Sequence, residues 1–87
     1  MEMSENRTVT AYVLMKLKIG TTDSVLEQLR LVEEATVVAV TTGAYDIIVR
    51  LEVPSLEALY DITIHKIHTI PGIEETSTAV VEKMYSV

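Results

Sequence analysis

Apolar or aromatic side chains occupy every second position of two segments of this chain, and this pattern limits the fold more than any other feature. Every odd-numbered side chain in residues 8–19 is apolar, and residues 45–53 repeat the pattern. Because successive side chains of a β-strand point to opposite faces, each segment is predicted to be a strand with one apolar face. These two faces are expected to be covered by helices.

The rest of the chain supplies two helices and two more strands. Residues 35–42 and 73–85 are rich in β-branched side chains, which is typical of strands. Two other groups of apolar side chains recur at the spacing of one helix face. They are Val25, Leu26, Leu29 and Val32 in the first helix, and Leu56, Leu59, Tyr60, Ile64 and Ile67 in the second. Only a two-residue turn separates residues 35–42 from residues 45–53, so these strands are predicted to form a hairpin.

The predicted order of elements is strand, helix, strand, strand, helix, strand. This is the order of the ferredoxin-like βαββαβ fold, an α+β fold in which right-handed crossovers place both helices on one face of a four-stranded antiparallel sheet. The other face is expected to carry the large apolar side chains of Tyr12, Leu14, Ile48, Val80 and Met84. Because these would face water in a monomer, we expect two copies to pair through their sheets as a homodimer of the dimeric α+β barrel type.

The chain is short and contains no cysteine. Its 87 residues are predicted to form one domain at residues 8–87, and the polar residues 1–7 are interpreted as a loose N-terminal leader. Without cysteine, neither a disulfide nor a cysteine-based zinc site can stabilise the fold. Stability must therefore come from packing and from assembly with other copies.

The net charge of the chain is −6, from 13 acidic and 7 basic side chains. Nucleic-acid binding needs a clustered positive patch. The basic residues here are scattered along the sequence, so no direct contact with nucleic acid is expected. The chain has no apolar run of membrane-spanning length and no signal-peptide pattern, which predicts a cytoplasmic protein that does not enter a membrane.

The turn at Gly43 is followed closely by one carboxylate, Asp46. A free amino acid carries an ammonium group and a carboxylate, so its site needs a negative group and oriented hydrogen-bond donors. Asp46 can supply the negative charge. The backbone amides of Thr42, Gly43 and Ala44 can act as donors, because a tight turn leaves some of its amides unpaired. A positive φ at Gly43 would suit such a turn.

The same residues also have structural explanations, which stay open at this point. Any tight hairpin favours glycine, so Gly43 alone does not indicate a ligand. The Asp46 side chain can hydrogen-bond the turn itself. Tyr45 can be a core residue.

Three short motifs follow one another along the chain: Gly43-Ala44-Tyr45-Asp46 at the hairpin, Ile70-Pro71-Gly72-Ile73 after the second helix, and Thr76-Ser77-Thr78-Ala79-Val80-Val81 with Lys83 in the last strand. In this order they resemble the effector-binding domain, or RAM domain, of the Lrp/AsnC family of transcription regulators, and the resemblance covers residues 8–87. Full-length members place a helix-turn-helix domain before this module. Residues 1–7 leave no room for such a domain, so the chain resembles the stand-alone members.

The resemblance implies a ligand and an assembly as well as a fold. The implied ligand is a free amino acid held where neighbouring dimers meet, and the dimers are implied to form an octamer or a decamer. Thr76 and Thr78 are implied to contribute hydroxyls to the site, and Tyr45 to wall it; apart from the resemblance, both threonines are ordinary strand residues. No cofactor is implied, and a full-length regulator of the same family is an implied partner.

Two other functions are compatible with the sequence. One is a small dimeric ferredoxin-like enzyme of the cofactor-independent monooxygenase type. Such an enzyme needs polar or titratable groups between sheet and helices, where the odd-numbered strand positions are almost wholly aliphatic. The other is a purely structural assembly subunit that has lost its ligand.

His65 and His68 lie three residues apart on the second predicted helix, on one side of it. Without a cysteine or a clearly placed third ligand they make an incomplete metal site, so no metal is predicted. At a subunit contact, the two imidazoles would instead make assembly sensitive to mildly acidic pH.

Overall fold

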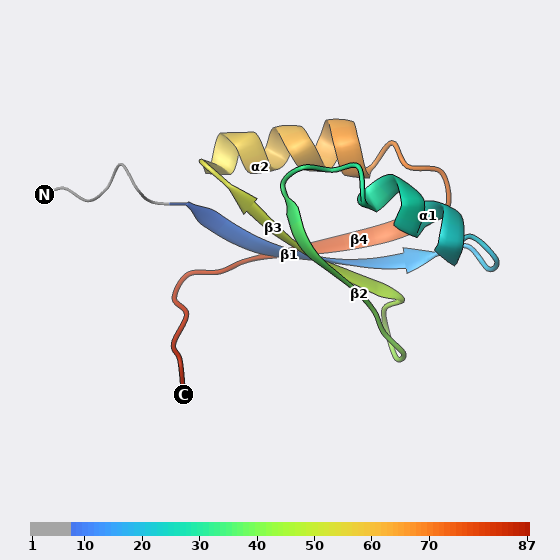
Figure 1. Cartoon of the computed structure of the whole chain (residues 1–87), viewed down its shortest axis with the longest axis horizontal. Helices are drawn as coiled ribbons and strands as arrows, with labels where there is room; N and C mark the ends of the chain where they lie inside the picture. The colour runs from blue at the N-terminus through green and yellow to red at the C-terminus, as the bar shows by residue number, and fades with distance from the viewer. Residues whose placement is uncertain (1–7) are drawn as a thin grey trace, which may run out of the picture.

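Four strands form one antiparallel sheet, and the helices cover one of its faces (Figure 1). The computed structural model describes residues 8–87, and the predicted leader at residues 1–7 lies outside the described residues. In chain order the elements are β1 (Val9–Leu17), α1 (Thr22–Leu29), β2 (Ala35–Val40), β3 (Ile47–Val53), α2 (Leu56–Ile62), η2 (Thr63–Ile67) and β4 (Ile73–Val80). The strand order β2-β3-β1-β4 confirms the predicted ferredoxin-like fold. Every helix within residues 8–87 is too short or too polar to traverse a lipid bilayer.

The two alternating segments form the central strands β1 and β3, and their odd-numbered side chains point into the core. Apart from the partly buried Val9 at the start of β1, these side chains are at most 8% exposed. They are Ala11, Val13, Met15 and Leu17 in β1, and Ile47, Val49, Leu51 and Val53 in β3. Complete burial of one large aliphatic side chain stabilises a fold by about 1.5–3 kcal/mol. The predicted apolar faces are therefore a main source of stability.

The opposite face of the sheet is open in one protomer. Tyr12, Leu14 and Ile48 lie on this face, as predicted. All three side chains are half-buried. Leu14 and Ile48 are direct partners in the β1–β3 ladder, so they form one apolar pair at the middle of this face.

The register between β1 and β4 places alternate β4 side chains on the helix side of the sheet. Val80 pairs with Ala11, and Thr78 pairs with Val13. Direct partners in an antiparallel ladder project to the same face. Val80 therefore lies on the helix side with Ala11, and its predicted position on the open face was wrong.

β4 is also shorter than the predicted strand at residues 73–85, because it ends at Val80. The last backbone hydrogen bond to β1 is donated by Val81 N–H to the Thr10 carbonyl at 2.8 Å. β1 begins at Val9, so the chain after Val81 has almost no strand left to pair with. Met84 consequently lies beyond the sheet, and its predicted place on the open face was wrong.

The second helical segment buries only part of the face predicted, since Leu59 and Ile67 are in the core as expected. Leu59, Ile62, Thr63 and Ile67 are buried, whereas three side chains predicted to join that face are exposed. The exposed fractions are 50% for Leu56, 66% for Tyr60 and 54% for Ile64. The segment continues into η2, a π-helical turn in which His68 N–H donates to the Thr63 carbonyl at 2.9 Å, one residue further back than in an α-helix. This wider turn keeps Ile67 over the core in line with Leu59 and Thr63.

A hydrogen-bonded cluster on the open face centres on Glu52. Its Oε1 accepts from the Thr10 hydroxyl at 2.9 Å, and its Oε2 accepts from Arg50 Nε at 2.9 Å. The hydrogen bond from Thr10, together with the hydrogen bond and positive charge of Arg50, lowers the pKa of Glu52 below its ordinary value of 4.5.

This lowered pKa predicts a pH dependence of stability. Because the folded-state pKa lies below the unfolded one, the contribution of Glu52 is complete above pH 4.5 and is lost as the pH falls through the folded-state value. Urea unfolding of wild type and Glu52→Gln should therefore differ most at neutral pH, with the difference shrinking on acidification. Glu82→Gln, beyond the last strand, removes one charge without touching the cluster and controls for net charge. A difference that grows on acidification would contradict the prediction.

Candidate functional site

The loop between β2 and β3 is longer than the two-residue turn predicted from the sequence. β2 ends at Val40 and β3 begins at Ile47, so residues 41–46 connect them. The base of the loop is closed by Thr41: its N–H donates to the Asp46 carbonyl at 2.9 Å, and its hydroxyl donates to the Tyr45 carbonyl at 2.8 Å. The loop begins directly after the last β2–β3 pair, Val40 with Ile47, so the predicted strands at residues 35–42 and 45–53 were too long at this end.

The tip of this loop presents backbone donors to the outside. Thr42, Gly43 and Ala44 are exposed. Gly43 has a φ of 117°, which confirms the predicted positive value. The hydrogen bonds among residues 8–87 do not use the backbone amides of these three residues as donors.

Asp46 lies at the end of the loop and is oriented by β1. Its Oδ2 accepts from the Leu17 N–H at 2.8 Å, and its own N–H donates to the Met15 carbonyl at 2.9 Å. The β1–β4 register shifts between Lys16 and Leu17, and the carboxylate bonds to the Leu17 amide at this irregularity. Asp46 therefore does have a structural role, but not the predicted hydrogen bond to its own turn. Its side chain accepts a hydrogen bond from the neighbouring strand β1 instead.

The second oxygen of the Asp46 carboxylate has no partner among the described residues. A carboxylate has about four acceptor positions on its two oxygens. Asp46 is half-buried, and Tyr45 beside it is half-buried at the base of the loop. The loop therefore holds a negative acceptor in a fixed orientation close to the exposed amides of the tip.

The two threonines predicted for the site lie on β4 and project to the helix side. Thr76 pairs with Met15, and Thr78 pairs with Val13, both of which are core residues. The Thr76 hydroxyl lies 2.9 Å from Nε2 of His68, within hydrogen-bonding distance. Thr78 is exposed.

Within one protomer the loop and these threonines do not come together. Met15 is in β1, which lies between β3 and β4 in the sheet. The Asp46 N–H bonds to Met15 across the β3 edge of β1, and Thr76 pairs with Met15 across the β4 edge. Two strand spacings therefore separate β3 from β4, about 10 Å, which exceeds the reach of the charged end of one amino acid. The predicted site residues form two separate halves.

A groove lies beside Thr78, between α2–η2 and β4. Its volume is about 330 Å³. The residues that line it are Leu59, Tyr60, Thr63, Ile64, His68, Thr78 and Val80. We call it the α2–β4 groove. Sequence reasoning assigned Tyr60 and Ile64 to the core and Val80 to the open face, so it missed the groove. The apolar side chains of the second helix spread over a wider arc than one buried face can hold. This width could have indicated that some of them line a surface groove.

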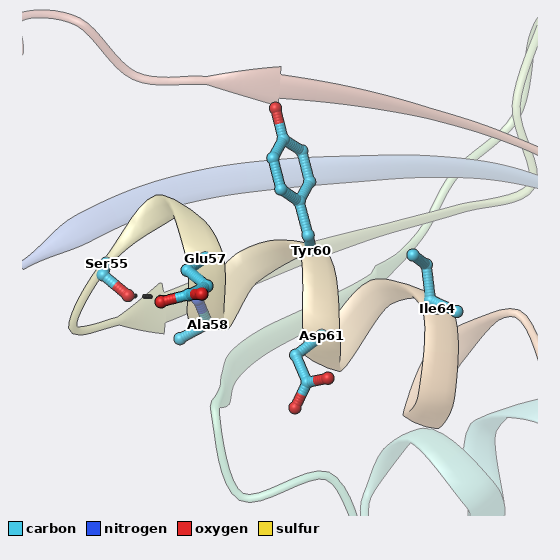
Figure 2. Close-up of a pocket in the computed structure, with 6 residues that line it drawn as sticks. All are labelled: Ser55, Glu57, Ala58, Tyr60, Asp61 and Ile64. Atoms are coloured by element: carbon cyan, nitrogen blue, oxygen red, sulfur yellow. Dashed lines mark hydrogen bonds between the residues drawn. The ribbon is translucent and has the colours of Figure 1, made fainter.

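A larger hollow of about 580 Å³ lies on the outer side of α2. Figure 2 shows Tyr60 extending from the helix toward β4, with Ile64 on the same side and Asp61 pointing away. The lining residues all come from one continuous segment, from Ser55 to Ile64. Ligand sites are concave and bring polar groups together from several elements, so this hollow is the weaker candidate.

The two histidines have separate local partners. His65 Nδ1 lies 3.0 Å from an Asp61 carboxylate oxygen, and both side chains are largely exposed. His68 meets Thr76. Residues 8–87 contain no group of three or more His, Cys, Asp or Glu side chains that could hold a metal ion.

The space between sheet and helices is filled with apolar side chains. Thr63 is the one polar side chain buried among the described residues, and its hydroxyl donates to the Leu59 carbonyl at 2.7 Å. The monooxygenase alternative requires polar or titratable groups that can act on a substrate in this space. A threonine that is already hydrogen-bonded within its own helix gives that alternative no support.

The family model of the Lrp/AsnC ligand binding domain matches residues 10–86, and this chain belongs to that family. The transcriptional regulator FL11 of Pyrococcus horikoshii is 35% identical over 75 residues, which cover 86% of this chain and 49% of FL11. The chain therefore spans about half the length of the curated relatives that it matches.

Solved structures agree with this assignment. AsnC of E. coli is 31% identical with a TM-score of 0.84, over 91% of this chain and 56% of that one. The hypothetical protein PHS023 of P. horikoshii is 34% identical with a TM-score of 0.80, over 88% of this chain and 93% of that one. The chain is thus a regulator-family module with the fold of these proteins.

Proposed function

We propose that this chain is a non-enzymatic amino-acid sensor that binds its effector between two protomers. The observation that carries the proposal is the β2–β3 loop, where Asp46 is held by Leu17 and offers a second carboxylate oxygen beside exposed backbone amides. A negative acceptor suits the ammonium group of an amino acid, and the amides suit its carboxylate. Thr76 and Thr78 of a neighbouring protomer supply the second half of the site.

One solved structure adds support for this class of ligand. A transcriptional regulator from Neisseria meningitidis, solved as a complex with L-Met, is 12% identical to this chain with a TM-score of 0.84, over 91% of this chain. At this identity the likeness shows a shared fold and nothing more. The proposal for this chain rests on its own loop and on its membership of the family.

The proposed assembly follows from the separation of the two halves of the site. The open face, with Tyr12, Leu14 and Ile48, is the proposed homodimer contact. Dimers then join into an octamer or decamer, in which the loop of one protomer reaches β4 of the next. A ligand that binds only the assembled form adds its binding free energy to assembly and shifts the oligomer population.

The proposed biological output passes through a protein partner in the cytoplasm. A net charge of −6 disfavours contact with DNA, whose phosphates repel an acidic surface. We assign the regulatory effect to co-assembly with a full-length regulator of the same family. An assembly subunit without a ligand remains the alternative, and the following experiment separates the two.

The experiment compares two substitutions of Asp46 by calorimetric titration with each common amino acid. Asp46→Asn keeps an acceptor for the Leu17 amide but replaces the other oxygen with a donor that opposes an ammonium group. We expect wild-type stability and an effector affinity reduced by about tenfold or more, since hydrogen bonds to charged groups contribute about 1.5–3 kcal/mol. Asp46→Ala should lose both effector binding and about 1–3 kcal/mol of stability, because the Leu17 amide loses its acceptor.

Unchanged affinity in Asp46→Asn would remove Asp46 from the site. A wild-type protein that binds no amino acid would favour the assembly subunit. Urea unfolding at one fixed protomer concentration gives the stability readout, because assembly makes stability concentration-dependent.

A further inference from the structure

The α2–β4 groove has one polar end and one apolar end. His68 meets Thr76 at 2.9 Å, and β4 runs on from there through Thr78 to Val80. Tyr60 and Ile64 precede His68 on the helical segment, and both line the groove with Thr78 and Val80. The polar end therefore lies at His68, whose imidazole is next to Thr76 outside the groove, and the apolar end lies at Tyr60 and Val80.

The apolar end carries large side chains that stay exposed in the part of the chain from residue 8 to residue 87. Exposed fractions are 66% for Tyr60, 54% for Ile64 and 46% for Val80. Figure 2 shows Tyr60 of α2 and Ile64 of η2 on one side of the helical segment, with the Tyr60 ring extending toward β4. Exposed apolar side chains gathered in a groove mark a binding surface, and a bound apolar group would remove them from water.

The described lining of the groove has no lysine, arginine or carboxylate to pair with a charged effector side chain. The hydroxyl of Thr63 is already donated to the Leu59 carbonyl at 2.7 Å, so it has no proton left for a ligand. At the apolar end, away from His68, a lysine or glutamate side chain would lose part of its water with no charged partner beside it, which is unfavourable.

We infer that the α2–β4 groove receives the side chain of the effector and selects amino acids with neutral, apolar side chains. This inference rests on the proposed function, which places the charged end of the effector between Asp46 of one protomer and Thr76 and Thr78 of the next. From those threonines, an effector side chain of a few carbons reaches Ile64, Tyr60 and Val80. Tyr60 and Ile64 are available for this role because both lie beside the groove and outside the core.

The first test is calorimetric titration of the wild-type protein with leucine, methionine, lysine and glutamate. We expect leucine or methionine to bind at least about tenfold more tightly than lysine and glutamate. Tightest binding of lysine or glutamate would overturn the inference and leave the proposed function intact. Absence of binding by every amino acid would overturn the proposed function, and the inference with it.

The second test compares Ile64→Glu with Leu56→Glu. Both side chains are exposed on one helical segment, at 54% and 50%, but only Ile64 lines the groove, so the pair is matched in helix, exposure and charge. Ile64→Glu should weaken leucine or methionine binding by about tenfold or more, whereas Leu56→Glu should change it less than about twofold. Circular dichroism confirms that both variants fold. Equal losses in the two variants, or no loss in Ile64→Glu, would overturn the inference.

Discussion

Gly72→Ala is expected to destabilise the fold by about 2–5 kcal/mol. Gly72 has a φ of 103°, where a side chain costs about 1–2 kcal/mol. An added Cβ would also lie 2.8 Å from Thr21 Cβ and 3.1 Å from Val25 Cγ2. Thr21 cannot swing aside freely, because its hydroxyl donates to the Lys18 carbonyl at 2.7 Å. Overpacking of this kind adds about 1–3 kcal/mol.

Gly20→Ala is the matched control for the backbone contribution. Gly20 has a φ of 84°, and an added Cβ would meet nothing within 4 Å. It should therefore cost about 1–2 kcal/mol from the positive φ alone. Urea unfolding of both variants at one protomer concentration measures the difference. Equal losses would mean that the turn at Gly72 moves away from α1 without cost, which contradicts the close packing between them.

Leu59→Ala is expected to cost about 2–5 kcal/mol, the usual range for truncation of a large core side chain. Leu59 is 1% exposed. Its loss leaves a cavity between α2 and the sheet, and neighbouring core side chains relax only partly into such a space. Urea unfolding with comparison of midpoints and slopes measures this loss.

Leu56→Ala makes the same chemical change one turn earlier on the same helix. Leu56 is 50% exposed, so its loss should stay within about 0.5 kcal/mol. The pair tests the helix face that the structure buries, because the sequence pattern had placed both leucines on it. A larger loss for Leu56→Ala than for Leu59→Ala would mean that the helix presents the opposite side to the sheet.

The orientation of the central strands β1 and β3 could be predicted because one face of each strand packs on the core along most of its length. Odd positions from Ala11 to Leu17 and from Ile47 to Val53 contact only core, so local alternation records their orientation. The edge strand β4 is mostly exposed on both faces. Threonine and valine side chains can lie on either face of such a strand. The face on which Val80 lies could therefore not be predicted from the local pattern.

The candidate site was predictable in part. Gly43 marks a positive φ, and Asp46 is the carboxylate beside it, so the loop was found from the sequence. The Leu17 amide that orients Asp46 lies 29 residues away, at a register shift that no local pattern reports. The α2–β4 groove also escaped prediction, because it is lined by Tyr60 and Ile64, which the apolar pattern had placed in the core.

By itself the sequence determined the order of elements, the buried faces of β1 and β3, and the loop with Gly43 and Asp46. Each of these depends on neighbours along the chain, and periodicity and turn chemistry record them directly. Only the tertiary structure decided the face of β4, the exposed side of α2 and the division of the site into two halves. These depend on strand register and on helix packing, which join residues far apart in sequence and leave no local trace.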